Sequence, residues 1–168
     1  KSIEPKRSIK INPNDLVPTG CIPFNLECSG RIEGAFALGK LVNIIGDSHS
    51  GKSLLSLTIF AECSLRERFN DYRFIYDDVE AANEFDLAYL FGSKVNERIE
   101  QTVRSKTIEE LNDNLARALE DDKPFIYILD SFDGLTSEAA LEKDAENRKK
   151  REKGSQTSGS YGDGKAKK

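Results

Sequence analysis

Apolar residues are distributed along this chain in short runs of two kinds, which predict alternating strands and helices. Four runs rich in β-branched and aromatic residues have the length of strands: 40–45, 73–80, 98–103 and 125–130. Between them, apolar residues recur at helical spacing, most clearly in residues 54–61 and 108–119. Strands that alternate with helices are typical of a parallel sheet with right-handed crossovers. We therefore expect an α/β fold in which helices flank a mainly parallel sheet.

The helix expected at 108–119 has the clearest N-terminal signal. Thr107 and Glu110 have the spacing of a capping box, in which each side chain bonds an otherwise unpaired amide of the first turn. The apolar positions of this segment fall on one stripe of the helix: Ile108, Leu111, Leu115, Ala118 and Leu119. The segment is therefore expected to be an amphipathic helix.

The composition is that of a soluble globular protein, with 38% hydrophobic and 32% charged residues among 168. No run approaches the ~18 apolar residues of a membrane span, and no signal peptide opens the chain. Cys21, Cys28 and Cys63 form no C-x-x-C pair, so we expect reduced, buried thiols and neither a disulfide framework nor a zinc site. Because the chain contains no Met, we expect it to be an internal fragment of a longer protein.

Charge and composition divide the chain into three regions. Residues 1–15 hold two prolines and scattered charges and are typical of a linker or arm. Residues 16–141 contain the expected strands and helices. Residues 142–168 hold nine Lys or Arg and five Asp or Glu, and their Gly- and Ser-rich part has nothing with which to form a core. We therefore expect 142–168 to be a disordered basic loop or tail.

One segment carries a specific chemical motif. The pattern G-x-x-x-x-G-K-S/T is matched by Gly46, Asp47, Ser48, His49, Ser50, Gly51, Lys52 and Ser53. It follows an expected strand and opens an expected helix, which is the setting that a phosphate-binding loop requires. The motif therefore predicts a nucleoside triphosphate site, with ATP as the nucleotide.

Each position of this loop has a chemical reason. Gly46 and Gly51 allow a tight backbone path, and the amides from His49 to Lys52 favour an anion at a helix N-terminus. Lys52 would place its ammonium on the β and γ phosphates, and Ser53 would give its hydroxyl to Mg²⁺. His49 is the only histidine of the sequence. In this loop its backbone amide would contact the phosphates, and its ring needs no chemical role. The alternative is a strand-to-helix turn with an incidental lysine.

Asp130 ends the apolar run 125–130, which has the character of a buried parallel strand. Ligands of open α/β sheets bind at the carboxyl ends of the strands, and a carboxylate there is suited to hold the water shell of Mg²⁺. We therefore predict that Asp130 supports the metal. The alternative is an aspartate that caps a following helix.

A base for the attacking water must come from another strand. Many P-loop ATPases carry a Glu directly after the metal-supporting Asp, but Ser131 stands there in this chain. The run 73–80 ends in three acids, and strand periodicity points Asp78 and Glu80 the same way. We expect Glu80 to orient and deprotonate water. The alternative is a solvated acidic loop.

These features together resemble the ATPase core of the RecA-like recombinases. The matching positions are Leu16 to Gly20, Gly34, Gly39 and Lys40, the phosphate loop, Glu80, and Leu129 to Ser131. Residues 74–85 are similar to RecA-like proteins of bacteriophages. The resemblance covers residues 16–141 and implies a RecA-like P-loop NTPase fold. It also implies that Glu80 is the catalytic glutamate, that Glu84 lies near the adenine, and that the protein is cytoplasmic in a bacterial or phage-infected cell.

The resemblance also implies a partner for the basic region. In the family, the segment after the strand of Asp130 leads to a mobile loop that faces single-stranded DNA. Basic residues suited to phosphate contacts follow this strand here: Arg148, Lys149, Lys150, Arg151 and Lys153. Tyr161 would suit a base stack. The alternative is a solvated basic tail without a ligand.

The function expected from the resemblance is that of a DNA-dependent ATPase acting in homologous recombination and repair. It would assemble as a homo-oligomeric filament on single-stranded DNA, with hydrolysis switching DNA affinity, and it would need no membrane. A ring-forming replicative helicase shares this core and is one alternative. A non-catalytic ATP-binding regulatory module is another. The remaining strands, the second DNA loop and the γ-phosphate sensor of the family are expected beyond residue 168.

Overall fold

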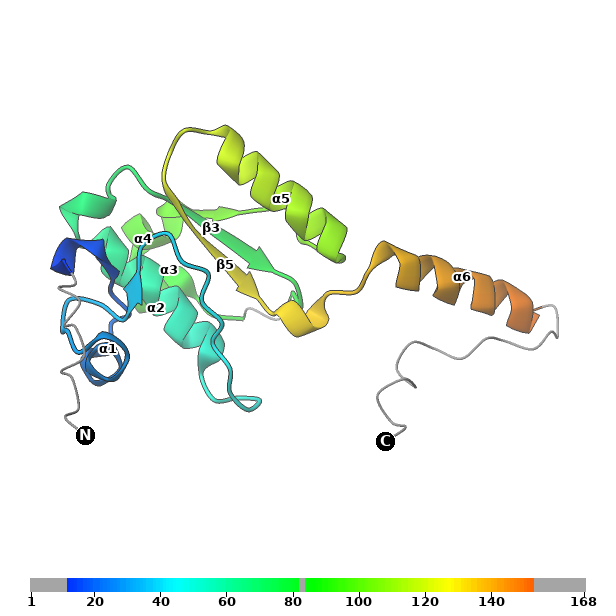
Figure 1. Ribbon diagram of the computed structural model, residues 1–168, viewed down its shortest axis with the longest axis horizontal. Coiled ribbons are helices and arrows are strands. Elements are labelled where there is room, and N and C mark those ends of the chain that lie inside the picture. Colours follow the sequence, from blue (N-terminus) through cyan, green and yellow to red (C-terminus); the bar gives the residue numbers. More distant parts are fainter. Residues whose placement is uncertain (1–11, 82–83, 153–168) are drawn as a thin grey trace, which may run out of the picture. The chain divides into compact units, whose positions relative to one another are not determined.

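The computed structural model describes residues 12–81 and 84–152, which form helices and short strands (Figure 1). The chain divides into two compact units. Unit 1 comprises Lys1–Phe74 and Phe85–Ile99, and unit 2 comprises Ile75–Glu84 and Glu100–Lys168. Each unit has its own packing and is described by itself.

Unit 1 contains the N-terminal elements and the helices around residue 90. Its elements are η1 (Pro13–Asp15), β1 (Leu16–Val17), α1 (Ile22–Ser29), β2 (Phe36–Ala37), α2 (Lys52–Ser64), η2 (Glu67–Phe69), α3 (Leu87–Phe91) and α4 (Ser93–Arg98). β1 and β2 pair antiparallel. Gly34 lies against this pair, because a Cβ on it would be 2.5 Å from the carbonyl oxygen of Val17. A larger residue at position 34 would therefore push β1 away.

Aromatic side chains fill the core of unit 1. Phe60 of α2 stacks on Phe74 with ring centroids 5.1 Å apart, and both are fully buried. The guanidinium of Arg98 lies 4.3 Å from the centroid of Phe74, and it donates hydrogen bonds to the carbonyls of Phe69 and Tyr72. Arg98 therefore links the end of α4 to the last residue of η2 and to the segment that follows η2.

Unit 2 holds most of a three-stranded parallel sheet in the order β4-β3-β5 (Figure 1). Its elements are β3 (Arg73–Asp78), β4 (Ile99–Gln101), α5 (Ile108–Glu120), β5 (Phe125–Asp130), η3 (Phe132–Gly134) and α6 (Glu138–Glu152). The first residues of β3 and β4 belong to unit 1. The structure confirms the expected α/β class, with a parallel sheet flanked by helices.

A fully buried carboxylate, Asp77, joins the parts of unit 2. Its Oδ1 accepts a hydrogen bond from the Ser105 amide (3.0 Å), and its Oδ2 accepts from the hydroxyls of Ser105 (2.6 Å) and Tyr127 (2.7 Å). Asn114 of α5 donates to the Ser105 hydroxyl (2.8 Å). Burial and the bond to Asp77 raise the pKa of Tyr127 above its ordinary value. The tyrosine therefore remains a donor. One polar cluster thus joins β3, β5, α5 and Ser105, which lies in the segment between β4 and α5.

The Thr107 half of the expected capping box is confirmed at the start of α5, whereas Glu110 bonds the amide of the residue before the cap. The Thr107 side chain accepts from the Glu110 amide (3.1 Å), and the Glu110 carboxylate accepts from the Lys106 amide (2.6 Å). Thr107 also forms a parallel bridge with Thr136. The helix start is thus fixed by local chemistry that the sequence makes visible.

The strand expected at 40–45 was a wrong prediction. These residues have no regular secondary structure, and the side chains of Leu41, Val42 and Ile45 are exposed. A strand needs a neighbour to complete its hydrogen-bond ladder. None of the strands in the described ranges pairs with this run. An apolar, β-branched sequence is therefore not enough to form a strand at this position.

The disorder expected for 142–168 also needs correction for its first part, because α6 extends to Glu152. Ala, Glu, Lys and Arg dominate this segment and favour helix. Acidic residues begin the helix and basic residues end it, which complements the helix dipole. Glu146 and Lys150 are 3.9 Å apart at i, i+4 spacing. Residues 153–168 and 1–11 lie outside the described residues.

The cysteines and the membrane prediction can be compared with the structure. Cys63 is buried as expected, and burial raises the pKa of its thiol to about 12. Cys21 and Cys28 are exposed, which differs from the prediction. Cys21 is the N-cap residue just before α1, and Cys28 lies within this helix. No helix in the described ranges is long and apolar enough to cross a membrane.

Replacement of Tyr127 by Phe tests the buried cluster. The substitution removes the hydroxyl that bonds Asp77, so it should lower the free energy of unfolding by about 1–2 kcal/mol. Tyr89→Phe is the control: Tyr89 is 86% exposed, and its change should stay within about 0.5 kcal/mol. Urea unfolding monitored by circular dichroism measures both. Equal stability of the two variants would contradict a stabilising role for the Tyr127 hydroxyl.

Candidate functional site

The segment from Gly46 to Ser53 forms one tight loop at the start of α2 in unit 1. The Ser50 amide donates to the Asp47 carbonyl (3.2 Å), which closes a turn. His49 and Gly51 have left-handed backbone angles, with φ 61° and 89°, and Gly51 is the N-cap of α2. A Cβ on Gly46 would be 2.8 Å from the Ser50 hydroxyl. A side chain at position 51 would therefore strain the backbone, and one at position 46 would have to displace the Ser50 hydroxyl.

Lys52 closes this loop with its side chain. Its ammonium donates to the carbonyls of Gly46 (2.9 Å) and Asp47 (2.7 Å). The first amides of a helix have no partner inside the helix and carry a partial positive charge. The start of α2 therefore combines a cation with free amide donors, which is the chemistry that attracts an anion. Ser53 follows in the first turn of α2 and is half-buried.

The segment before α1 holds α2 in place, a role that the sequence did not reveal. The Thr58 hydroxyl of α2 donates to the Thr19 carbonyl (2.9 Å). A Cβ on Gly20 would lie 3.2 Å from Cγ of Glu62 and 3.5 Å from Cβ of Thr58. Thr19 is fully buried, and its hydroxyl donates to Asn25 (2.6 Å). The Thr-Gly pair thus gives close packing along the helix that carries the loop.

Asp130 lies at the end of β5 in unit 2. Its Oδ2 accepts a hydrogen bond from the Tyr76 hydroxyl (3.1 Å). Burial, then the negative charge of Asp130, raises the pKa of Tyr76 above its ordinary value. Tyr76 therefore stays protonated and orients the Asp130 carboxylate.

Glu80 follows β3 and is held close to the end of β5. The Val79 amide donates to the Asp130 carbonyl (2.8 Å), and the Ser131 hydroxyl donates to Oε1 of Glu80 (2.6 Å). Gly134 allows this approach, since a Cβ on it would be 2.8 Å from Val79 Cγ1 and 3.4 Å from Glu80 Cγ. The Glu80 side chain is exposed and remains open to a ligand.

The three acids after β3 have different environments. Asp77 is fully buried in the polar cluster, whereas Asp78 is half-buried and Glu80 is exposed. Asp77 lies in a part of β3 that is covered on both faces, since the four residues from Phe74 to Asp77 are all buried. Glu80 is therefore the acid of this run with both exposure and a defined orientation. Glu84, expected near the adenine, is exposed just after the two undescribed residues 82–83.

Ser53 and Asp130 are the residues expected to bind magnesium. Nowhere in residues 12–81 and 84–152 do three His, Cys, Asp or Glu side chains gather as a metal site. Mg²⁺ at a nucleotide usually takes few protein ligands, with phosphate oxygens and waters completing its shell. The hydroxyl of Ser53 and the carboxylate of Asp130 are oxygen donors of the required kind. Each residue by itself thus carries an oxygen of the kind that Mg²⁺ takes, and the magnesium site stays a prediction.

The expected site residues thus fall into two groups. The phosphate loop, including Lys52 and Ser53, belongs to unit 1, and Glu80 and Asp130 belong to unit 2, where the structure brings them together. The basic residues expected to meet DNA lie exposed in the last turns of α6: Arg148, Lys149, Lys150 and Arg151. Lys153 and Tyr161 lie outside the described residues.

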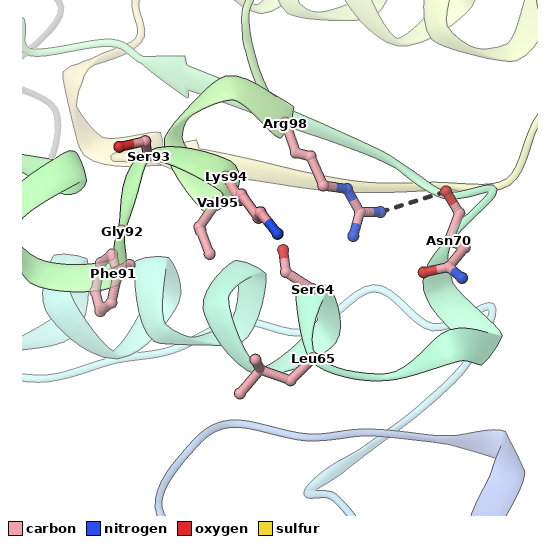
Figure 2. Close-up of a pocket in the computed structure, with 9 residues that line it drawn as sticks. All are labelled: Ser64, Leu65, Asn70, Phe91, Gly92, Ser93, Lys94, Val95 and Arg98. Atoms are coloured by element: carbon pink, nitrogen blue, oxygen red, sulfur yellow. Dashed lines mark hydrogen bonds between the residues drawn. The ribbon is translucent and has the colours of Figure 1, made fainter.

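A separate pocket of about 660 Å³ lies in unit 1 (Figure 2). It is lined by Ser64 and Leu65 at the C-terminal end of α2, by Asn70, and by residues 91–95 and Arg98 around α3 and α4. Because α2 has 13 residues, its two ends are about 20 Å apart at 1.5 Å per residue. The pocket is therefore distinct from the phosphate loop, which lies at the other end of this helix.

Comparison with known proteins adds no relative. No protein-family model matches the chain, and a search of curated proteins finds no match. The residues and their geometry therefore carry the functional argument.

Gly134→Ala tests the close approach beside Glu80. The added methyl would collide with Val79, so we expect a loss of about 1–3 kcal/mol in the free energy of unfolding. Asp133→Ala, at the exposed neighbouring position, is the matched control and should change it by less than about 0.5 kcal/mol. Urea titration of both variants gives the values. A Gly134→Ala variant as stable as the control would show that the loop has room to move away.

Proposed function

We propose that this chain is the ATP-binding and ATP-hydrolysing core of a RecA-like, DNA-dependent recombinase. The observation that carries the proposal is the loop at the start of α2, where Gly51 caps the helix and Lys52 is held over the loop carbonyls. A lysine ammonium beside unpaired helix amides suits the phosphates of a nucleotide. The recombinase class rests on the sequence resemblance.

Binding would begin with an exchange of partners at Lys52. Within the part of the chain that the structure describes, its ammonium donates to two neutral carbonyls, at 2.9 and 2.7 Å. Phosphate oxygens carry negative charge and form stronger, charge-assisted bonds with an ammonium. The β and γ phosphates would therefore draw Lys52 from the carbonyls of Gly46 and Asp47. The amides of the first turn of α2 would complete the contact with the phosphates.

Hydrolysis would use the acids of unit 2. Glu80 would accept the proton of a water as that water attacks the γ phosphorus, and ADP would leave with the electrons of the broken bond. Mg²⁺, when bound with the nucleotide, would neutralise charge that develops on the phosphate oxygens. Ser53 of unit 1 and Asp130 of unit 2 are the residues that the sequence resemblance predicts as its oxygen ligands. Tyr76 would keep the Asp130 carboxylate in one orientation through its hydrogen bond.

DNA binding would use the basic end of α6. Arg148, Lys149 and Arg151 are exposed there, and cations of this kind bind phosphate backbones by releasing counterions. Filament assembly on single-stranded DNA follows from the resemblance and belongs to the proposal. In it, hydrolysis would lower the affinity of the protein for DNA.

Two substitutions should separate ATP binding from ATP hydrolysis. Lys52→Ala removes the ammonium, so it should abolish ATP binding measured by isothermal titration calorimetry. Glu80→Gln removes the base but keeps the shape, so binding should stay near normal while turnover falls by about 10² or more. Lys123→Ala, at an exposed position outside both groups, is the control for the lost charge.

Other outcomes would point to other functions. Undiminished binding in Lys52→Ala would remove the phosphate-loop assignment. Unchanged turnover in Glu80→Gln would remove Glu80 as the base. ATP binding without any turnover in the unmodified protein would favour a regulatory module, and directional unwinding with ring-shaped particles would favour a helicase.

A further inference from the structure

We propose that Ser131 is a positioning residue for the general base: its hydroxyl holds one carboxylate oxygen of Glu80, so that the other oxygen faces the attacking water. This inference rests on the proposed hydrolysis at Glu80. It assigns a role to the residue that stands where many P-loop ATPases carry a second acid. The supporting observations are the bond itself, the backbone contacts behind it, and the exposure of the carboxylate.

The hydrogen bond between the two residues is short. The Ser131 hydroxyl donates to Oε1 of Glu80 at 2.6 Å. Hydroxyl-to-carboxylate bonds of about 2.5–2.7 Å are charge-assisted and stronger than bonds between neutral groups. The two residues are 51 positions apart in the sequence, so the fold must bring them together. Local chain geometry does not explain the contact.

The backbone beneath this bond is constrained from two sides. The Val79 amide donates to the Asp130 carbonyl (2.8 Å), which joins the residue before Glu80 to the residue before Ser131. Gly134 leaves space for the Glu80 side chain, with the position of an added Cβ only 3.4 Å from Glu80 Cγ. The Ser131 hydroxyl is therefore presented to Glu80 by the sheet ends and by the turn of η3.

The consequence for catalysis is orientation. Glu80 is an exposed side chain with several rotatable bonds, and without a partner it would sample many positions. A base acts only when it lies within hydrogen-bond reach of the proton that it removes. Holding Oε1 leaves Oε2 as the oxygen that is available to water. This is the arrangement in which a third group orients the base of a catalytic pair.

The pairing predicts a specific kinetic signature. Ser131→Ala should lower kcat for ATP about tenfold, equivalent to a barrier about 1.4 kcal/mol higher, with KM changed by less than about twofold. Ser131→Thr keeps the hydroxyl and should restore most of the rate. Ser131→Cys keeps the size with a much weaker donor, so it should behave like Ser131→Ala.

The decisive experiment combines these changes with Glu80→Gln and measures steady-state ATP hydrolysis. If Ser131 acts through Glu80, Ser131→Ala should cost about tenfold in the parent and almost nothing in the Glu80→Gln background. An equal loss in both backgrounds, or no loss in the parent, would overturn the positioning role. If the proposed role of Glu80 itself is wrong, a different result is expected: Glu80→Gln alone would leave turnover unchanged. Circular dichroism of each variant verifies that it is folded.

Discussion

The buried carboxylate of Asp77 is the interaction on which the arrangement of unit 2 depends. A charged group with no exposure to water is stable only when its oxygens are bonded, and here the Ser105 amide and the hydroxyls of Ser105 and Tyr127 satisfy it. These partners come from the segment between β4 and α5 and from β5. The end of β3 is therefore fixed relative to β5, and the exposed acid three residues further, Glu80, inherits a defined position beside Ser131.

Features that depend on nearby residues were predictable from the sequence. The cap of α5 needs only Thr107 and its neighbours, and the turn before Lys52 needs only its glycines and the helix that follows. The strand expected before that turn does not form in the described residues. The strands β3 and β5 were also found, since aromatic and β-branched residues concentrate there. For the same reason the α/β class and the parallel sheet could be inferred.

Features that depend on distant partners were not predictable. Residues 40–45 have strand-forming sequence, but no described strand pairs with them, so the ladder is missing. The helix α6 (Glu138–Glu152) was not predicted, although its Ala, Glu, Lys and Arg residues favour helix, because the Gly- and Ser-rich sequence that follows has nothing with which to form a core. The run of acids gave no sign that Asp77 is structural, since its partners Ser105 and Tyr127 lie far along the chain. The bond between Ser131 and Glu80 was hidden for the same reason.

The most direct measurement is the steady-state rate of ATP hydrolysis by the protein with and without single-stranded DNA, at low and at raised salt. For a DNA-dependent ATPase, we expect the rate to rise strongly with DNA. The stimulation should weaken at raised salt, because releasing counterions from the DNA phosphates then gains less free energy. Turnover that is the same with and without DNA, or no turnover at all, would contradict the assignment of this chain to a DNA-dependent recombinase core.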